Sequence, residues 1–206
     1  MERVMVYIDG FNLYYALRER RWQRYYWLDL QSFSKSLLTT WQELAGVRYF
    51  TARVVAEALD PQKPVRQNTY LEALDTLEGL HINYGYFVPK TVRCYNCGET
   101  RRTFEEKMTD VNIAVEMLSD AGDDKFDTAI VVSADGDLAG PVEAIRNRYH
   151  SKRAVVAFPP EKHSARLRDA ASASFAIGRT KFRDSLLPDQ VTRDDGYVLT
   201  RPVRWA

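Results

Sequence analysis

The feature that most constrains the fold is a repeated alternation of short apolar runs with longer amphipathic segments. Two of the runs, Val4–Ile8 and Thr128–Ser133, are rich in β-branched residues and have the length of buried strands. Three further segments have strand character, namely Val47–Ala56, His81–Val88 and Arg153–Phe158. Strands that alternate with helices favour an α/β sandwich with a mostly parallel central sheet.

Helical spacing predicts a helix in each of six amphipathic segments: Tyr14–Arg21, Leu30–Leu44, Val65–Leu77, Phe104–Ala121, Leu138–Tyr149 and His163–Ala171. Pro61–Pro64 is expected to form a loop, and Lys90–Arg102 a polar excursion. We expect one domain over residues 1–180, with a cysteine-containing insert at about 90–102. The remaining residues 181–206 lose periodicity and are expected to pack on the domain or on a partner subunit.

The composition is that of an ordinary globular chain. Its 206 residues, of which 45% are hydrophobic, are enough for one sizeable core. The net charge of +1 does not point to a partner. The apolar run Val4–Ile8 is too short for a secretory signal or a membrane span. We therefore expect a soluble cytoplasmic protein that does not bind a membrane.

Acidic loops follow both strong strands. Asp9 precedes a glycine after the first strand, and Asp135 and Asp137 flank a glycine after the second. Ligands bind beyond the carboxyl ends of parallel strands, so these three aspartates are candidates for one site. Taken singly, each Asp-Gly pair is equally a common turn former.

A third acidic position lies between these loops. If the segment around Asp110 is a helix, Lys107 and Asp110 share one stripe and Asp110 faces the same edge of the sheet. Crowded carboxylates repel one another until protons or cations neutralise them. Mg²⁺ and Mn²⁺ prefer carboxylate and water oxygens, and such ions promote phosphodiester hydrolysis. By itself, Asp110 is equally an exposed helical residue.

These motifs resemble the NYN family, a branch of the PIN-like nuclease superfamily. The matching segments are Tyr7–Asn12, Lys107–Asn112 and Ser133–Asp137. The chain also looks like the bacterial LabA-like (DUF88) group, through the Cys94–Gly98 insert and the ending from Leu187-Pro188 to Arg201–Trp205. The resemblance implies a PIN-like Rossmannoid three-layer sandwich. It also implies a ribonuclease that depends on Mg²⁺ or Mn²⁺.

The resemblance further implies roles for individual residues. The catalytic positions carried over are four aspartates that would hold metal and one asparagine: Asp9, Asp110, Asp135, Asp137 and Asn12. Asp137 would act directly or through water, and Asn12 would position a ligand or a phosphate. Ser133 would support the acidic loop, and Lys107 or nearby arginines would offset charge on the RNA backbone. Leu138 replaces a phenylalanine of many relatives, which is a packing change.

The segment Arg18–Trp27 mixes arginines with aromatic rings. Such a mixture can pair with phosphates and stack on bases, which makes Arg18 and Arg21 candidates for substrate binding. The alternative is a solvated helix end followed by aromatic residues of the core.

Cys94 and Cys97 have the spacing of half a structural zinc site. The missing ligands would come from one of the histidines at 81, 150 and 163, or from a second copy in a homodimer that shares four cysteines. The other readings are a redox-sensitive dithiol and two ordinary loop cysteines.

Several other enzyme classes lack their motifs here. The sequence contains no phosphate-binding loop of the Walker type and no dinucleotide fingerprint after Val4–Ile8. Phe11 stands where an aspartyl phosphatase needs a second aspartate, and no serine lies in a nucleophile elbow. We therefore predict a metal-dependent endoribonuclease. The alternatives are a non-catalytic RNA-binding or scaffolding module and a nuclease that acts on DNA.

Overall fold

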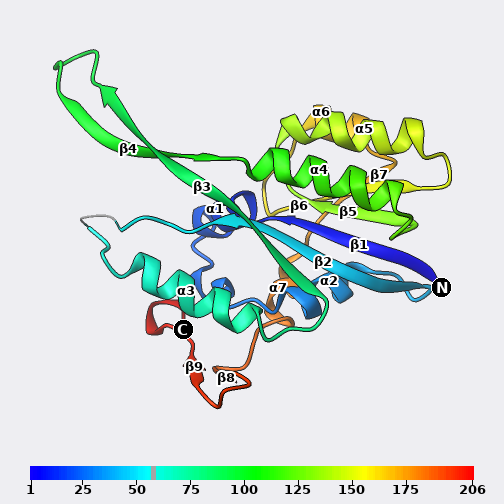
Figure 1. The fold of residues 1–206 in the computed structure, drawn as a ribbon, viewed down its shortest axis with the longest axis horizontal. Coiled ribbons are helices and arrows are strands. Elements are labelled where there is room, and N and C mark those ends of the chain that lie inside the picture. The colour runs from blue at the N-terminus through cyan, green and yellow to red at the C-terminus, as the bar shows by residue number, and fades with distance from the viewer. Residues whose placement is uncertain (57–58) are drawn as a thin grey trace.

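The β-branched runs form the centre of a seven-stranded sheet, in a computed structural model that describes residues 1–56 and 59–206 (Figure 1). The strand order is β4-β3-β2-β1-β5-β6-β7, and only β4 runs antiparallel to its neighbour. The strands of this sheet are β1 Glu2–Asp9, β2 Gln42–Ala52, β3 Leu80–Arg93, β4 Thr100–Lys107, β5 Thr128–Val132, β6 Arg153–Phe158 and β7 Ala173–Ala176. A separate two-stranded sheet pairs β8 (Gln190–Thr192) with β9 (Val198–Thr200).

Helices cover both faces of the large sheet. The α-helices are α1 Gly10–Glu19, α2 Leu30–Leu37, α3 Lys63–Leu74, α4 Thr109–Gly122, α5 Ala139–Arg148, α6 Ala165–Ala170 and α7 Arg179–Arg183. Short 3-10 helices are η1 Gln23–Tyr26, η2 Gly136–Leu138 and η3 Val203–Trp205. The α1, α2, α3 and α7 helices lie on one face, and α4, α5 and α6 lie on the other (Figure 1).

The central strand β1 shows why both faces are covered. Alternate side chains of a strand point to opposite faces. Val4, Val6 and Ile8 belong to the core cluster under α1–α3, whereas Met5 and Tyr7 belong to the cluster under α4–α6. All five are at most 8% exposed. The predicted three-layer α/β sandwich is therefore confirmed.

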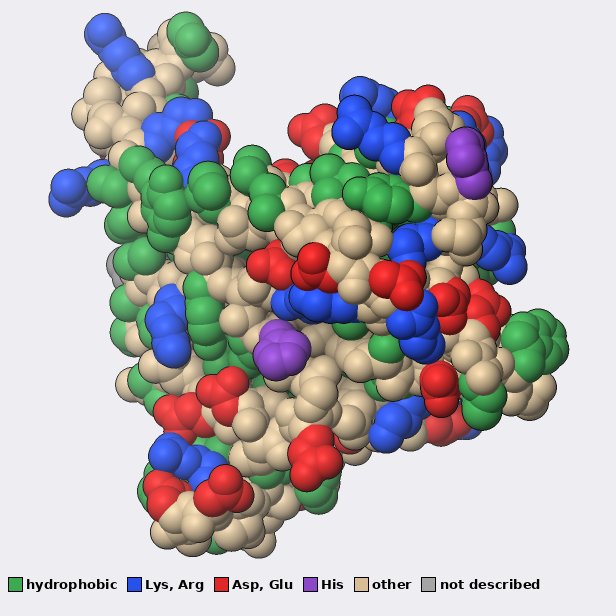
Figure 2. All heavy atoms as spheres, turned by 45° about the vertical axis from the view of Figure 1, so that its right-hand side comes forward, with side chains coloured by type: hydrophobic (Ala, Val, Ile, Leu, Met, Phe, Trp, Pro, Cys, Tyr) green, Lys and Arg blue, Asp and Glu red, His purple; other side chains and the backbone are tan. Residues whose placement is uncertain are grey.

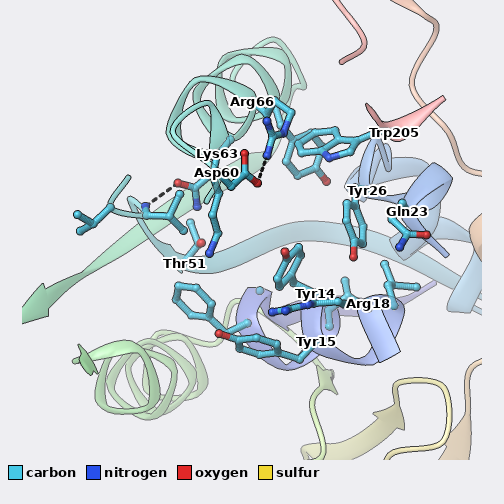
Figure 3. Close-up of a pocket in the computed structure, with 18 of the residues that line it drawn as sticks. Tyr14, Tyr15, Arg18, Gln23, Tyr26, Thr51, Asp60, Lys63, Arg66 and Trp205 are labelled. Atoms are coloured by element: carbon cyan, nitrogen blue, oxygen red, sulfur yellow. Dashed lines mark hydrogen bonds and ion pairs between the residues drawn. The ribbon is translucent and has the colours of Figure 1, made fainter. Parts of the chain in front are cut away.

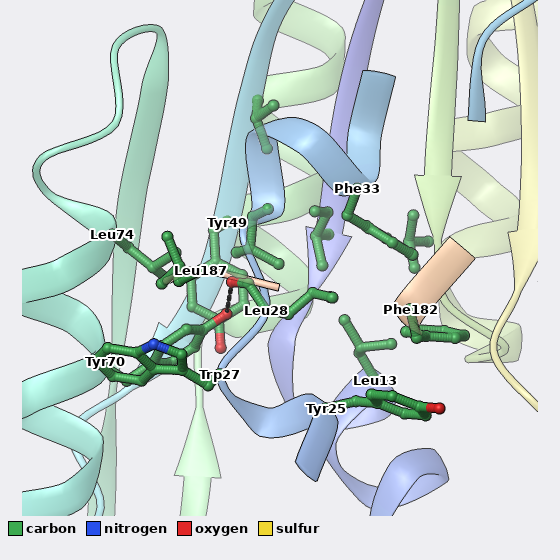
Figure 4. Close-up of a cluster of buried hydrophobic side chains, with 14 of the residues drawn as sticks. Leu13, Tyr25, Trp27, Leu28, Phe33, Tyr49, Tyr70, Leu74, Phe182 and Leu187 are labelled. Atoms are coloured by element: carbon green, nitrogen blue, oxygen red, sulfur yellow. Dashed lines mark hydrogen bonds between the residues drawn. The ribbon is translucent and has the colours of Figure 1, made fainter. Parts of the chain in front are cut away.

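The core under α1–α3 is aromatic (Figure 4). Trp27, Tyr25, Phe33 and Phe182 are all at most 1% exposed, and Phe33 stacks on Phe182 with ring centroids 5.1 Å apart. Tyr70 is also buried, and its hydroxyl donates to the Leu28 carbonyl oxygen at 2.8 Å. Large buried rings contribute much of the apolar area of a core. For Tyr25 and Trp27, the core reading of the aromatic segment is therefore correct.

Three predicted helices are wrong at one end. The helix expected over Tyr14–Arg21 begins four residues earlier, at Gly10, directly after Asp9. The helix expected over Leu30–Leu44 ends at Leu37, and β2 begins at Gln42. The helix expected over Phe104–Ala121 begins at Thr109, because residues 104–107 pair with β3 across a hairpin. In the Leu30–Leu44 segment apolar residues continue from the helix into the strand, whereas residues 105–107 are charged and show no strand pattern, so periodicity alone locates neither boundary.

The predicted polar excursion Lys90–Arg102 is the outer part of this β3–β4 hairpin. The hairpin extends well beyond the body of the protein (Figures 1 and 2). On the face drawn in Figure 2, acidic and basic side chains are interspersed, as the small net charge leads one to expect.

The C-terminal segment packs on the same core as the helices. Leu187, Val191 and Leu199 are buried in the cluster under α1–α3, and Trp27 Nε1 donates to the Pro188 carbonyl oxygen at 2.8 Å. The boundary placed at residue 180 falls within α7, whose Phe182 is fully buried. No helix among the described residues is long and apolar enough to cross a bilayer.

Candidate functional site

Adjacent parallel strands bring the first two acidic loops together. β1 pairs with β5, and both strands end at the same edge of the sheet. Asp9 is the N-cap of α1 and is 4% exposed. Its Oδ1 accepts from the Asn12 amide at 3.0 Å, and its Oδ2 accepts from the Ser133 hydroxyl at 2.9 Å. Both oxygens of this buried carboxylate are therefore fixed by neutral donors.

The second loop is fixed by the same small network. Ser133 Oγ accepts from the Asp135 amide at 3.0 Å, and Asn12 Oδ1 accepts from the Ala134 amide at 3.0 Å. Asp135 caps η2, since its Oδ1 accepts from the Asp137 amide at 2.9 Å. Asn12 and Ser133 therefore link the two loops directly.

Asp110 approaches this edge from another element, α4. It lies in the first turn, where the helix dipole favours a negative charge. Glu106 anchors the start of this helix, because its Oε1 accepts from the amide of Thr109 at 3.0 Å and from its hydroxyl. Met108 has a left-handed backbone with φ of 79°, a conformation that costs free energy for a residue other than glycine. The turn from β4 into α4 is thus held by local contacts.

Gly85 is required where β3 passes this turn. A Cβ atom on Gly85 would lie 2.5 Å from the Lys107 carbonyl oxygen and 2.8 Å from Glu106 Oε1. We expect Gly85→Ala to reduce the free energy of unfolding by about 1–3 kcal/mol, because the turn must move outwards. Guanidinium unfolding measures this loss. Gly140→Ala in α5, where a Cβ would meet nothing within 4 Å, is the matched control, and equal behaviour of the two variants would contradict the close approach.

Asp9, Asn12, Asp110 and Asp135 all line one cleft of about 430 Å³ at this edge. Ser133 is buried behind it and does not line it. Asp137 is exposed and lies outside the lining. The structure therefore brings three of the four predicted aspartates to a common cleft.

The predicted cationic residues lie elsewhere. Lys107 ends β4 and pairs with Glu105 at 2.9 Å, so the helical stripe drawn through it and Asp110 is wrong. Arg18 lines a second, larger cavity next to the cleft. Arg21 has a left-handed φ of 56° after α1 and lines neither of these cavities.

Sequence reasoning missed several residues that line the cleft: Phe11, Tyr15, Glu19, Glu106, Thr109, Ala134, Lys162 and His163. For two of these residues, Lys162 and His163, their position after a predicted strand could have indicated the site. Lys162 and His163 follow β6, a third parallel strand, and therefore lie at the same edge. Lys162 pairs with Glu19 at 2.6 Å, which places a cation on the rim of the acidic cleft.

The cleft raises the pKa of two carboxyl groups. Burial, together with the Asp110 and Asp135 charges, raises the pKa of Asp9 to about 6 despite its hydrogen bonds. Burial is also the main reason that the pKa of Asp110 rises to about 6, and the neighbouring Asp135, Glu106 and Asp137 charges add to it. Titratable groups with such shifts in a cleft are typical of functional sites.

These shifts predict how the stability of the metal-free protein depends on pH. The native state retains protons on Asp9 and Asp110 that the unfolded state releases above pH 3.8. These two groups should therefore lower the free energy of unfolding as pH rises from about 4 to about 6, by about 3 kcal/mol for Asp9 and by less for the half-exposed Asp110. Carboxyl groups with a lowered pKa, such as Asp120 and Asp127, act in the opposite direction, so the contribution of Asp9 is measured as the difference between the wild type and Asp9→Asn in urea unfolding with EDTA. A difference that does not change across this pH range would contradict the assignment.

The donor set of the cleft suits a hard cation. Its carboxylate and amide oxygens are ligands that Mg²⁺ and Mn²⁺ prefer. Within residues 1–56 and 59–206, however, no three His, Cys, Asp or Glu side chains converge closely enough to form a ligand group by themselves. Mg²⁺ usually keeps several waters and takes only one or two protein carboxylates, so the residues present fit a largely hydrated ion.

The cysteine pair lies at the tip of the β3–β4 hairpin, and both thiols are free and exposed. The amides of Cys97 and Asn96 donate to Cys94 and lower the pKa of its thiol. No His, Cys, Asp or Glu in the described part of the chain completes a metal site with them. One copy of the chain therefore gives no support for a zinc site, and a site shared between copies stays a prediction.

The family model for the NYN domain matches residues 3–178. The chain belongs to the NYN family. The resemblance seen in the three acidic motifs is thus confirmed, and this NYN domain has a nuclease-like fold. The narrower LabA-like placement stays a prediction.

Two known proteins are similar to this NYN domain. One is 6-hydroxy-3-succinoylpyridine 3-monooxygenase from Pseudomonas putida, 29% identical over an alignment of 175 residues that covers 70% of this chain. The chain spans only 55% of that relative's length. The other is the crystal structure of a protein of unknown function from Vibrio parahaemolyticus, with a TM-score of 0.53 and 24% identity, over 90% of this chain and 96% of the other. This second likeness concerns the fold alone.

Proposed function

We propose that this NYN domain is a metal-dependent endoribonuclease that uses the acidic cleft to hydrolyse phosphodiester bonds. The observation that carries the proposal is the presence of Asp9, Asp110 and Asp135 in one cleft at the carboxyl edge of the sheet. The nuclease-like fold of the family supports it. The Pseudomonas relative is named a monooxygenase, but this chain spans only 55% of its length, so the acidic cleft is the basis for the proposed reaction class.

Each side chain of the cleft has a distinct part in this proposal. Asp9, Asp110 and Asp135 would hold Mg²⁺ or Mn²⁺, and Asp137 would reach the ion through water. The ion would supply a water of lowered pKa and stabilise negative charge on the phosphoryl group. Asn12 and Ser133 keep the two loops in place through their hydrogen bonds to Ala134 and Asp9.

The cations at the rim would act on the substrate. Lys162 lies on the rim beside Glu19 and would offset the charge of a bound RNA backbone. His163 also lines the cleft, where it packs edge-on against Phe158 at 4.8 Å. An exposed imidazole at this place offers a hydrogen-bond donor to a phosphate oxygen.

Incubation of the pure protein with a mixed pool of structured and unstructured RNAs tests the proposal. We expect cutting with Mn²⁺ or Mg²⁺ and none with EDTA. RNA that is bound but not cut with either metal would favour the non-catalytic RNA-binding module. If the protein neither binds nor cuts RNA, RNA is excluded as the substrate class. A parallel pool of DNA would then test the alternative of a nuclease that acts on DNA.

A further inference from the structure

Beside the acidic cleft lies a larger cavity of about 720 Å³, which opens between α1 and α3 over the carboxyl end of β2 (Figure 3). Phe11 and Tyr15 line both the cavity and the cleft, so the two are continuous. Sites of about 300–1,000 Å³ accommodate small organic groups. The hydrolysis proposed above does not assign a role to this cavity.

A row of aromatic rings in contact runs along the cavity and borders the cleft at Phe11 and Tyr15. The members of this aromatic row are, in order, Phe87, Phe11, Tyr15, Tyr14, Tyr26 and Trp205. The centroids of successive rings are 5.7, 6.4, 5.4, 5.0 and 5.7 Å apart. Tyr15 is 47% exposed, unlike the aromatic residues of the core. In Figure 3, Tyr14 and Tyr26 point into the open space, and Tyr15 lies below them beside α1. Half-exposed rings of this kind are platforms on which bases stack.

Cations surround the aromatic row. The basic residues that line the cavity are Arg18, Lys63, Arg66, Arg102 and Arg204, against one acidic residue, Asp60, in the described lining. Asp60 is already bound by Arg66 and by Arg204 at 3.0 Å. Arg18 and Arg102 are exposed and have no ion pair within the described part of the chain. Arg18 and Arg102 therefore give the described lining of the cavity positive charge, directly next to an acidic cleft.

The hairpin and the C-terminus complete the cavity. Phe87, Phe104 and Arg102 lie on one face of the β3–β4 hairpin and line the cavity. Arg204 and Trp205 close it from the end of the chain. Trp205 packs on Tyr70 at 6.2 Å and on Trp27 at 6.5 Å, so this wall is held by the core.

We propose that the cavity binds an unpaired nucleotide of an RNA strand whose neighbouring phosphate lies in the acidic cleft. The proposal rests on the proposed function and adds a subsite to it. Stacked bases of a duplex cannot present their faces to the aromatic row, whereas a single strand can. Arg18 and Arg102 contact the backbone of that strand on either side of the base. The site thus selects RNA that is single-stranded next to the cut.

Binding of a labelled single-stranded RNA of about 12 nucleotides, measured by anisotropy in EDTA, tests this proposal without cleavage. We expect Tyr15→Leu to weaken binding by about 5- to 100-fold through lost stacking. The Arg18→Gln/Arg102→Gln variant should reduce the slope of log K against log salt by about 1.4, since each lost phosphate contact on a single strand accounts for about 0.7. A duplex of the same sequence should bind the wild type more weakly.

Tyr197→Leu and Arg148→Gln are the matched controls, because both residues are exposed and lie outside the cavity. Wild-type affinity and salt slope in the cavity variants, or equal binding of duplex and single strand, would overturn the proposal even if the protein cuts RNA. Conversely, RNA binding that depends on the cavity, without any cutting, would support the nucleotide subsite and contradict the proposed endoribonuclease activity. All the substituted side chains are exposed, and a thermal melt verifies that each variant is folded.

Discussion

Asp9→Asn is expected to lose RNA cleavage while remaining folded. Asp9 is the most buried carboxylate of the acidic cleft and would hold the ion that stabilises charge on the phosphoryl group. Loss of several kcal/mol of that stabilisation lowers the rate by at least about 100-fold. Single-turnover cleavage of an end-labelled RNA with saturating Mn²⁺ measures the effect.

The same substitution should not reduce stability at neutral pH. Asparagine keeps one oxygen for the Asn12 amide, and its amide nitrogen can donate to the Ser133 oxygen. It also removes a charge that burial disfavours, as the raised pKa of Asp9 indicates. Asp169→Asn, on the exposed end of α6, is the matched control and should cut RNA normally. An inactive Asp9→Asn that is also unfolded would say nothing of chemistry, so urea unfolding accompanies the assay. A folded and fully active variant would contradict the role of Asp9.

Asp120→Ala is expected to reduce the free energy of unfolding by about 3–5 kcal/mol. Asp120 is fully buried and accepts from Arg48 at 2.5 and 2.6 Å, from the Tyr7 hydroxyl at 2.9 Å and from Lys125 at 3.0 Å. Burial acts to raise its pKa, but these donors outweigh it and lower the pKa. Removal of the carboxylate leaves a half-buried guanidinium and a buried hydroxyl without their partner.

Asp123→Ala is the matched control for this network. Asp123 lies three residues further along and is exposed, and within the described residues its one ion pair is with Lys125 at 3.2 Å. Surface pairs contribute about 1 kcal/mol or less, so its loss should be small. Guanidinium unfolding compares the two variants. Similar stabilities would mean that Arg48 and Tyr7 find other partners, and Glu116, at 3.0 Å from Arg48, is the available one.

The sequence predicts the first two acidic loops well because each follows a strand that is buried on both faces. Val4–Ile8 and Thr128–Val132 are strongly apolar, so their ends, and with them Asp9 and Asp135, are well defined. Parallel pairing then brings the two loops to one edge without further information.

The local sequence pattern does not predict how Asp110 is brought to the site. The predicted helical stripe began before Thr109, but residues up to Lys107 form an edge strand. Edge strands carry exposed polar side chains and lack the apolar pattern of buried strands. The turn through Met108, which redirects the chain into α4, depends on a left-handed residue and on the close passage of Gly85.

The larger cavity could not be predicted from local patterns. Its walls come from α1, α3, the β3–β4 hairpin and the last residues of the chain, which only the tertiary fold brings together. The residues of the segment Arg18–Trp27 lie in two different environments. Tyr26 and Arg18 line the cavity, whereas Trp27 is fully buried in the core.

The central claim is that the acidic cleft binds a divalent ion that is needed to cut RNA. A Mn²⁺ titration of single-turnover cleavage by the wild type and by Asp135→Asn, with EDTA as the zero point, tests it most directly. We predict that the wild-type rate rises from zero and saturates, while the variant stays at least about 100-fold slower at every Mn²⁺ concentration. Cleavage that persists in EDTA, or equal Mn²⁺ dependence in the two proteins, would contradict the claim.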